Sequence, residues 1–325
     1  MSLSFSNPSE FLSLPIFGLD ISQSSIKLSK LKRTSAGLVP QHVVRVAITE
    51  TCELFTGQAT HADCQEVKKI LIDLRKKYKI EFVHVSIPEE KTYVFKVDLP
   101  NDALHSIEEY IIYNMDQYVP LNPQELLFDY KILHSHATET TTPAVVTAIP
   151  RLVIEQYTAL IESAGISVIA FEPETHAIAR AVIDMDDMNP YIIINVDSFA
   201  TKVSVVEDGL VQYTQTLPVS GKDIVIISDS VAAALKESIN RVIVYWFTSR
   251  AKENLGPRIE NIILTGEGVS SPNLINFLES NLSVNASFGN VWKNCFNLND
   301  YVPQLSKQDS LQYATCLGLC LAKIK

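Results

Sequence analysis

The sequence predicts an α/β fold with two related halves and a smaller α+β block inserted into the first half. Three observations support this prediction. The 325 residues are 46% hydrophobic and 20% charged, which is typical of one large or two medium globular domains. Strand patterns and helix patterns alternate along the chain. A strand–turn–strand pattern near the N-terminus recurs after the middle of the chain.

Charge and hydropathy exclude several classes of protein. The net charge is −10, which disfavours nucleic acid as a partner. The opening segment, MSLSFSNPSEFLSLP, lacks the basic region and the continuous apolar core of a signal peptide. No apolar run is long enough to span a bilayer. We therefore expect a cytoplasmic protein whose contact with a membrane would come only through a partner.

The five cysteines are expected to be small core residues. The chain has no CxxC motif, and its only close pair is four residues apart on an apolar helical stretch. This spacing favours packing over a disulfide or a metal site. A protein without disulfides belongs in a reducing compartment. The five are Cys52, Cys64, Cys295, Cys316 and Cys320.

The first ninety residues predict three strands, a helix and a fourth strand. Strands fill residues 16–50, and a run of short polar residues joins the first two in FGLDISQSSIKLSKL. Apolar residues at helical spacing predict a helix over residues 63–78. The segment FVHVSIP then reads as a strand that Pro88 ends.

Residues 91–171 predict a compact block with the order strand, helix, strand, strand, helix, strand. Its first strand stops at Pro100, and Asn101 or Asp102 can cap a helix. A later helix from Arg151 ends before Gly165, a residue suited to a left-handed cap. Within this block His134 and His136 alternate onto one face of a strand. With no third ligand evident, surface histidines are favoured there over a metal site.

The second half repeats the opening pattern in YIIINVDSFATKVSVVEDGLVQYTQTLP. Asp20-Ile21-Ser22 aligns with Asn195-Val196-Asp197, and the strands that follow align with the same spacing. A long helix beginning at Ser228 or Ser230 follows. The buried strand IENIILTGEG then leads into a helix that opens at Ser271-Pro272. The apolar segment SLQYATCLGLCLA predicts a closing helix.

The polar turns at the ends of these strands are suited to phosphate. Consecutive backbone N–H groups in such turns point at an anion, and an acid at a strand end can hold a divalent cation. The Thr265–Gly268 turn precedes a helix N-terminus, where a nucleotide could lie on the backbone. An ordinary hydroxyl-rich turn is the alternative, since none of these patterns is specific by itself.

These segments resemble the actin-like ATPase superfamily and, within it, the PilM family of type IV pilus assembly proteins, relatives of FtsA. The matching stretches appear in the family's order: FGLDISQSSIKLSKL, FVHVSIPEEKTYVFKVDLP, IEEYIIYNMDQYVPLNPQELLFDYKIL, AVVTAIPRLVIEQYTALIESAGISVIAFEPETHAIARA, VSVVEDGLVQYTQTLPVSGKDI, IENIILTGEGVSSPNLINFL and LQYATCLGLCLA. The resemblance implies a duplicated, ribonuclease H-like actin fold. Residues 15–90 with 172–188 would form lobe 1, and 91–171 the FtsA/PilM-type insertion. Residues 189–325 would form lobe 2, with subdomain 2B largely absent after Gly221.

The resemblance further implies ATP and Mg²⁺ as cofactors, with no catalytic residue assigned. The residues it places at the nucleotide are Asp20, which would also hold Mg²⁺, Ser22, Ser24, Ser25, Lys27, Asn195, Asp197, Thr201, Gly266, Glu267 and Gly268. Four depart from the family pattern. Ser22 stands where the family has glycine, Asn195 and Asp197 replace Asp and Gly, and Glu267 replaces the second glycine of a pair. Added Cβ atoms and carboxylates there predict a weakened phosphate site.

The resemblance implies a scaffold of a type IV pilus or type II secretion-like assembly machine. Its expected partners are the N-terminal cytoplasmic peptide of a PilN-like bitopic inner-membrane protein and other pilus assembly components. The expected groove lies between the first subdomain and the inserted one, with Tyr93, Phe95, Tyr110 and Tyr113 as anchors or, alternatively, as ordinary core residues.

Two other functions remain as alternatives. An active actin-like ATPase or a sugar-kinase-type phosphotransferase would need intact phosphate turns and a positioned base. An FtsA-like membrane-tethered filament would need an amphipathic helix beyond the last core helix. This chain ends almost as soon as that helix does, which disfavours the filament.

Overall fold

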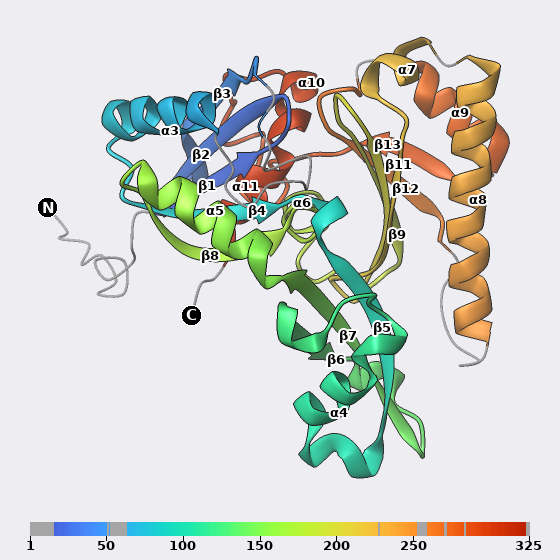
Figure 1. Cartoon of the computed structure of the whole chain (residues 1–325). Helices are drawn as coiled ribbons and strands as arrows, with labels where there is room; N and C mark the ends of the chain where they lie inside the picture. Colours follow the sequence, from blue (N-terminus) through green and yellow to red (C-terminus); the bar gives the residue numbers. More distant parts are fainter. Residues whose placement is uncertain are drawn as a thin grey trace, which may run out of the picture.

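Figure 1 shows the protein as a computed structural model, which describes residues 16–50, 52, 64–226, 228–251, 259–269, 272–282 and 284–322. Three β-sheets organise these residues: two sheets of five strands and one of three. Each larger sheet forms the centre of a lobe, and the smallest sheet extends from the body as the inserted subdomain (Figure 1). Within these ranges no helix is long and apolar enough to cross a bilayer.

The first lobe is built on a sheet with the order β3-β2-β1-β4-β8. Its strands are β1 (Ile16–Ile21), β2 (Ser25–Thr34), β3 (Gly37–Ala47), β4 (Phe82–Ile87) and β8 (Ser167–Pro173). The hairpin strands β1 to β3 are antiparallel, whereas β4 and β8 run parallel to β1. Helices α3 (Gln65–Tyr78) and α5 (Arg151–Ser163) bury their apolar faces against this sheet in one core.

The second lobe repeats the first. Its sheet has the order β11-β10-β9-β12-β13, formed by β9 (Tyr191–Val196), β10 (Thr201–Glu207), β11 (Leu210–Leu217), β12 (Asn261–Thr265) and β13 (Asn285–Phe288). Asp20 pairs with Lys27 across the first hairpin, and Asn195 pairs with Lys202 across the second. The aligned residues therefore occupy equivalent registers, which confirms the internal repeat.

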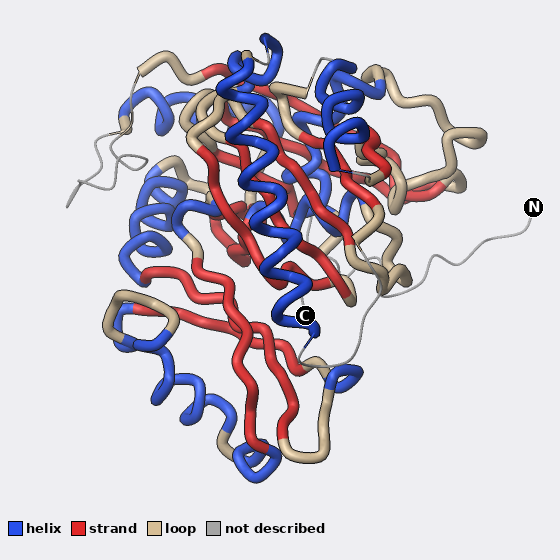
Figure 2. The backbone as a smooth tube through the Cα atoms, turned by 90° about the vertical axis from the view of Figure 1, so that its right-hand side faces the viewer, coloured by secondary structure: helices blue, strands red, loops and turns tan. Residues whose placement is uncertain are grey.

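Helices complete the second lobe. Between β11 and β12 the described chain forms α7 (Gly221–Ile226) and α8 (Asp229–Ala251), and α8 runs along the outer face of the sheet (Figure 2). Helix α9 (Pro272–Leu282) packs beside α8. The expected end of α8 at residues 254–257 lies outside the described residues.

Two buried helices lie where the lobes meet. Helix α6 (Glu174–Val182) packs against α11 (Ala314–Cys320), and α11 also packs on β1. A Cβ built on Gly318 would overlap the backbone carbonyl of Ala177, and one on Gly18 would overlap that of Cys316. Only glycine permits this close approach. The expected single C-terminal helix is divided into α10 (Lys307–Ser310), a 3-10 turn and α11.

The inserted subdomain consists of a sheet with the order β5-β7-β6 and the short helix α4 (Ile107–Asn114). Its strands are β5 (Tyr93–Pro100), β6 (Leu126–Ile132) and β7 (Thr141–Pro150). The helix expected after Pro100 begins as a 3-10 helix over Asn101–His105 and continues as α4.

The expected boundary of the insertion at residue 171 needs correction. Strand β8 pairs in parallel with β4 in the first sheet, and α5 contributes Val153, Tyr157 and Ile161 to the core of the first lobe. Helix α5 belongs to the first lobe because its apolar face is buried against the five-stranded sheet of that lobe. The insertion therefore ends with β7.

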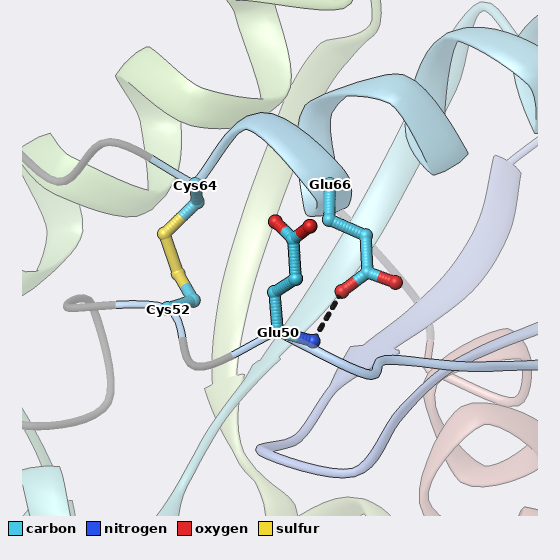
Figure 3. The surroundings of a disulfide bond; sticks show 4 residues. All are labelled: Glu50, Cys52, Cys64 and Glu66. Atoms are coloured by element: carbon cyan, nitrogen blue, oxygen red, sulfur yellow. Dashed lines mark hydrogen bonds between the residues drawn. A yellow bond between two sulfur atoms is a disulfide. The ribbon is translucent and has the colours of Figure 1, made fainter.

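The prediction that all five cysteines are unpaired core residues is wrong for two of them. Cys52 and Cys64 form a disulfide with their Cα atoms 5.0 Å apart (Figure 3). The segment after β3 returns to the start of α3, where Glu66 accepts hydrogen bonds from the Glu50 and Thr49 N–H groups. This return, which sequence spacing does not show, brings the cysteines together. Cys295, Cys316 and Cys320 are free, as predicted.

Candidate functional site

Three turns meet between the lobes, and the side chain of Glu267 joins them. Its Oε1 accepts a hydrogen bond from Ser24 Oγ at 2.9 Å, in the β1–β2 turn, and from Ser198 Oγ at 2.7 Å, in the β9–β10 turn. Its Oε2 accepts one from Arg45 Nη2 on β3 at 2.9 Å. A carboxylate of this chain thus lies between the two turns that the resemblance assigns to phosphates.

The charge on Glu267 is stabilised in this position. Burial alone would raise the pKa of its carboxyl, but the Lys27 ammonium, the two serine hydroxyls and the Arg45 guanidinium outweigh burial. The pKa of Glu267 is therefore lower than its usual 4.5. At neutral pH the Glu267 side chain is therefore a carboxylate anion, held in place by groups from both lobes.

Asp20, the expected Mg²⁺ ligand, is paired with a cation from its own hairpin. Its Oδ2 lies 3.5 Å from Lys27 Nζ, and its Oδ1 accepts a hydrogen bond from Ser86 Oγ at 2.7 Å. Burial would lower the pKa of Lys27, but the carboxylates of Asp20, Asp197 and Glu267 raise it overall. Lys27 is thus charged beside the carboxylate that a metal ion would need.

Lys202 is the equivalent cation of the second lobe. Its Nζ lies 2.6 Å from Asp197 Oδ2, 2.7 Å from Glu174 Oε1 and 3.6 Å from Glu90 Oε1. Burial would lower the pKa of Lys202, yet these carboxylates raise it well above its ordinary value. Burial also raises the pKa of Glu174, to about 8, against the attraction of Lys202.

Other residues predicted to contact the nucleotide form hydrogen bonds within the turns or to neighbouring strands. Ser22 Oγ accepts from the Ser25 N–H at 3.2 Å and donates to the Ser25 carbonyl at 3.1 Å. Thr201 Oγ1 donates to the Val219 carbonyl at 2.7 Å. Asn195 Nδ2 lies 3.3 Å from Asp197 Oδ2. These polar groups are therefore already engaged within the protein.

The two glycines of the Thr265–Gly268 turn are required by packing. Gly266 has φ +101°, and a Cβ there would overlap the Val196 carbonyl. The Gly266 N–H donates to the Leu311 carbonyl at 3.3 Å, and the Gly268 N–H donates to that of Val196 at 2.9 Å. This turn is thus fixed against β9, which positions Glu267.

A cavity of about 560 Å³ lies between the inserted sheet and the first lobe. The inserted sheet contributes Leu127, Asp129 and Lys131 of β6 and Val145, Thr147 and Ile149 of β7. The first lobe contributes Phe171, Glu172, His176 and Arg180, from β8 and α6. Strands β6 and β8, which flank the cavity, are each the last strand of their sheet.

The wall formed by β8 and α6 carries half-buried polar side chains. Arg180 Nη1 donates to Glu172 Oε2 at 2.8 Å. His176 is half-buried. Its Nδ1 is shielded from solvent without a hydrogen-bond partner, and desolvation of the ring lowers the pKa of His176 to about 4. The imidazole is therefore neutral and presents an unused polar atom beside the cavity.

The four aromatic residues predicted as groove anchors do not line this cavity. Tyr93, Phe95 and Tyr110 pack partly buried against the core of the inserted subdomain, whereas Tyr113 is 84% exposed. Sequence reasoning missed the cavity because its walls come from strands and a helix that are distant in the chain. The signal that could have indicated it is the polar alternation Asp129–Lys131 on an otherwise apolar strand.

Comparisons with known proteins agree with this architecture. A family model described as type IV pilus assembly protein PilM matches residues 18–229. The chain is similar to the solved "PilM-PilN type IV pilus biogenesis complex" at 15% identity and a TM-score of 0.74, covering 95% of this chain and 98% of that chain. This similarity confirms the expected actin-like fold. No curated protein matches the sequence.

Two further solved structures are similar at lower scores. One is the ethanolamine utilization protein EutJ from Carboxydothermus hydrogenoformans, with a TM-score of 0.47 and 11% identity over 94% of this chain and 88% of that chain. The other is MreB5 of Spiroplasma citri bound to ADP, with a TM-score of 0.48 and 10% identity over 95% and 96%.

Proposed function

Because this chain belongs to the PilM family of type IV pilus assembly proteins, we propose that it is a cytoplasmic, actin-like scaffold and not an ATPase. The observation that carries the second half of this proposal is the Glu267 carboxylate between the two phosphate-type turns. In this role the protein would organise other assembly components at the inner membrane through a membrane-anchored partner.

The charges around Glu267 disfavour a nucleotide. A triphosphate entering between the turns would have to displace Glu267 from Ser24 and Ser198 and would face its negative charge at close range. Asp197 adds a second carboxylate, held by Lys202. The ammonium groups that could attract phosphate are already paired with carboxylates of the protein. Without rearrangement, Mg-ATP would gain little here.

We expect Mg-ATP to bind the wild-type chain weakly, with no saturable signal at micromolar concentration in a calorimetric titration. Glu267→Gly removes the fixed anion and restores the residue type of the family pattern, so its apparent affinity for Mg-ATP should rise by at least tenfold. Glu279→Gly, which changes an exposed carboxylate away from the turns, is the control for net charge. Micromolar Mg-ATP binding by the wild type would instead support the ATPase or kinase alternative.

The cavity beside β6 and β8 is the site we propose for the partner's peptide. One solved structure to which this chain is similar is a complex of PilM with PilN. Both flanking strands are unpaired on the cavity side within the described sheets, so an extended peptide could add main-chain hydrogen bonds. Leu127, Ile149 and Phe171 would receive its apolar side chains. The neutral His176 and the Arg180–Glu172 pair would orient its polar groups.

Leu127→Asp is expected to weaken binding of the N-terminal peptide of a PilN-like protein from the same genome by at least tenfold, measured by fluorescence anisotropy. The introduced carboxylate would lie in the apolar part of the cavity and lose solvation when the peptide covers it. Leu152→Asp is the matched control, because Leu152 is 56% exposed and does not line the cavity, whereas Leu127 is 38% exposed and does.

Tyr113→Ala completes this experiment. If the peptide binds along α4, as the aromatic residues suggested, Tyr113→Ala will weaken binding and Leu127→Asp will not. That result would refute the cavity as the peptide site while leaving the scaffold function intact. Loss of binding in Leu127→Asp alone supports the cavity.

A further inference from the structure

One cluster of side chains outside both sites joins the inserted subdomain to the second lobe. His136 lies in a 3-10 helix (His134–His136) between β6 and β7, not on a strand as the sequence suggested. Glu207 ends β10, and Asp208 follows it in the turn to β11. The fold brings His136 beside Glu207 and Asp208, which lie more than seventy positions later in the sequence.

The geometry of the cluster fits a metal ion. His136 Nε2 lies 3.1 Å from Asp208 Oδ2, and one ligand atom from each of the three residues lies within 4.8 Å of the others. Two ligands bound to one zinc ion at about 2.0–2.1 Å and a tetrahedral angle are about 3.3 Å apart. The His136–Asp208 separation therefore already matches, and Glu207 needs only a small movement.

The local structure restricts these side chains. His136 is 8% exposed and Glu207 is 2% exposed, so neither can turn far into solvent. Gln212 Nε2 donates to Glu207 Oε2 at 3.3 Å, which orients the carboxylate as an outer hydrogen bond does for metal ligands. Asp208 lies in the β10–β11 turn with φ +54°, a left-handed conformation, and its carboxylate faces His136.

We propose that His136, Glu207 and Asp208 bind one divalent transition-metal ion of the Zn²⁺ or Mn²⁺ class. A neutral imidazole and two carboxylates carry two negative charges, which one such cation balances. Imidazole disfavours Mg²⁺ and Ca²⁺, which prefer oxygen ligands. Water completes the coordination on the Asp208 side, whose side chain is 21% exposed. The ion would tie the inserted subdomain to the second lobe.

The test uses the untagged full chain after treatment with EDTA. Titration with ZnCl₂ in a calorimeter should show one saturable site, and MnCl₂ should bind more weakly, in the Irving–Williams order. Asp208→Asn keeps a residue that tolerates the left-handed conformation and should weaken Zn²⁺ binding by at least tenfold. His136→Gln should do the same. His134→Gln, on the exposed part of the same 3-10 helix, is the matched control and should bind normally.

X-ray absorption of the wild-type Zn²⁺ complex provides a measurement that does not depend on the variants folding. It should show only nitrogen and oxygen ligands, including one imidazole. No saturable Zn²⁺ site, sulfur among the ligands, or unchanged affinity in folded Asp208→Asn would each overturn the proposal. Equal losses in His134→Gln and His136→Gln would also overturn it.

Discussion

Lys202→Met is expected to lower the free energy of unfolding by about 3–5 kcal/mol, the range for removing one partner of a buried ion pair. Lys202 Nζ lies within 2.7 Å of carboxylate oxygens of both Asp197 and Glu174. The lysine and Glu174 side chains are each only 7% exposed. Methionine would leave the Asp197 carboxylate without the cation that holds its pKa low, while Glu174, with a pKa of about 8, can stay protonated. Urea denaturation at pH 7 would measure the loss.

Two further variants test the cause of this effect. Lys293→Met breaks an ion pair with Asp184 of the same 2.7 Å length, but its partners are 35% and 55% exposed, so it should cost under about 1 kcal/mol. Lys202→Met combined with Asp197→Asn removes one stranded charge and should recover part of the stability. If Lys202→Met costs no more than Lys293→Met, burial of the charge cluster is not what makes Lys202 important.

Gly318→Ala is expected to lower the free energy of unfolding by about 3 kcal/mol, at the upper end of the range for overpacked cores. The added methyl group would meet the Ala177 carbonyl, which belongs to the backbone of α6 and cannot rotate away. The helices α6 and α11 would have to separate, which would disturb the contact of α11 with β1. Thermal and urea unfolding would both report the loss.

Gly209→Ala is the comparison for this variant. A Cβ on Gly209 meets open space, but its φ of +69° is unfavourable for alanine, so the expected cost is about 1–2 kcal/mol. A Gly318→Ala protein that is as stable as the wild type would show that α11 can move away from α6 without penalty.

Much of the fold could be predicted because its signals are local. The polar turns after β1 and β9 interrupt apolar strands at the same spacing, and the paired registers of Lys27 and Lys202 follow from that spacing. Gly165 follows the end of α5 with φ +77°, the left-handed conformation that its place in the sequence predicts. Strand β13 is not predicted by its sequence, because NASF is short and contains no β-branched residue.

The details of the site depend on contacts between distant segments, which periodicity does not show. The turn containing Glu267 could be located, but its contacts with Ser24 and Ser198 require the two lobes to be placed together. The Cys52–Cys64 disulfide depends in the same way on where the chain returns after β3. The expectation of a reducing compartment rested on unpaired cysteines and loses that support.

The way the inserted subdomain joins the body has a consequence for its evolution. Its first and last strands are hydrogen-bonded neighbours, with Tyr93 opposite Ala148 at the point of attachment. The chain therefore leaves the lobe and re-enters it at nearly the same place. A module joined through such adjacent ends can be exchanged for a different one by recombination, so the specificity of recruitment can change while the ancestral framework is retained.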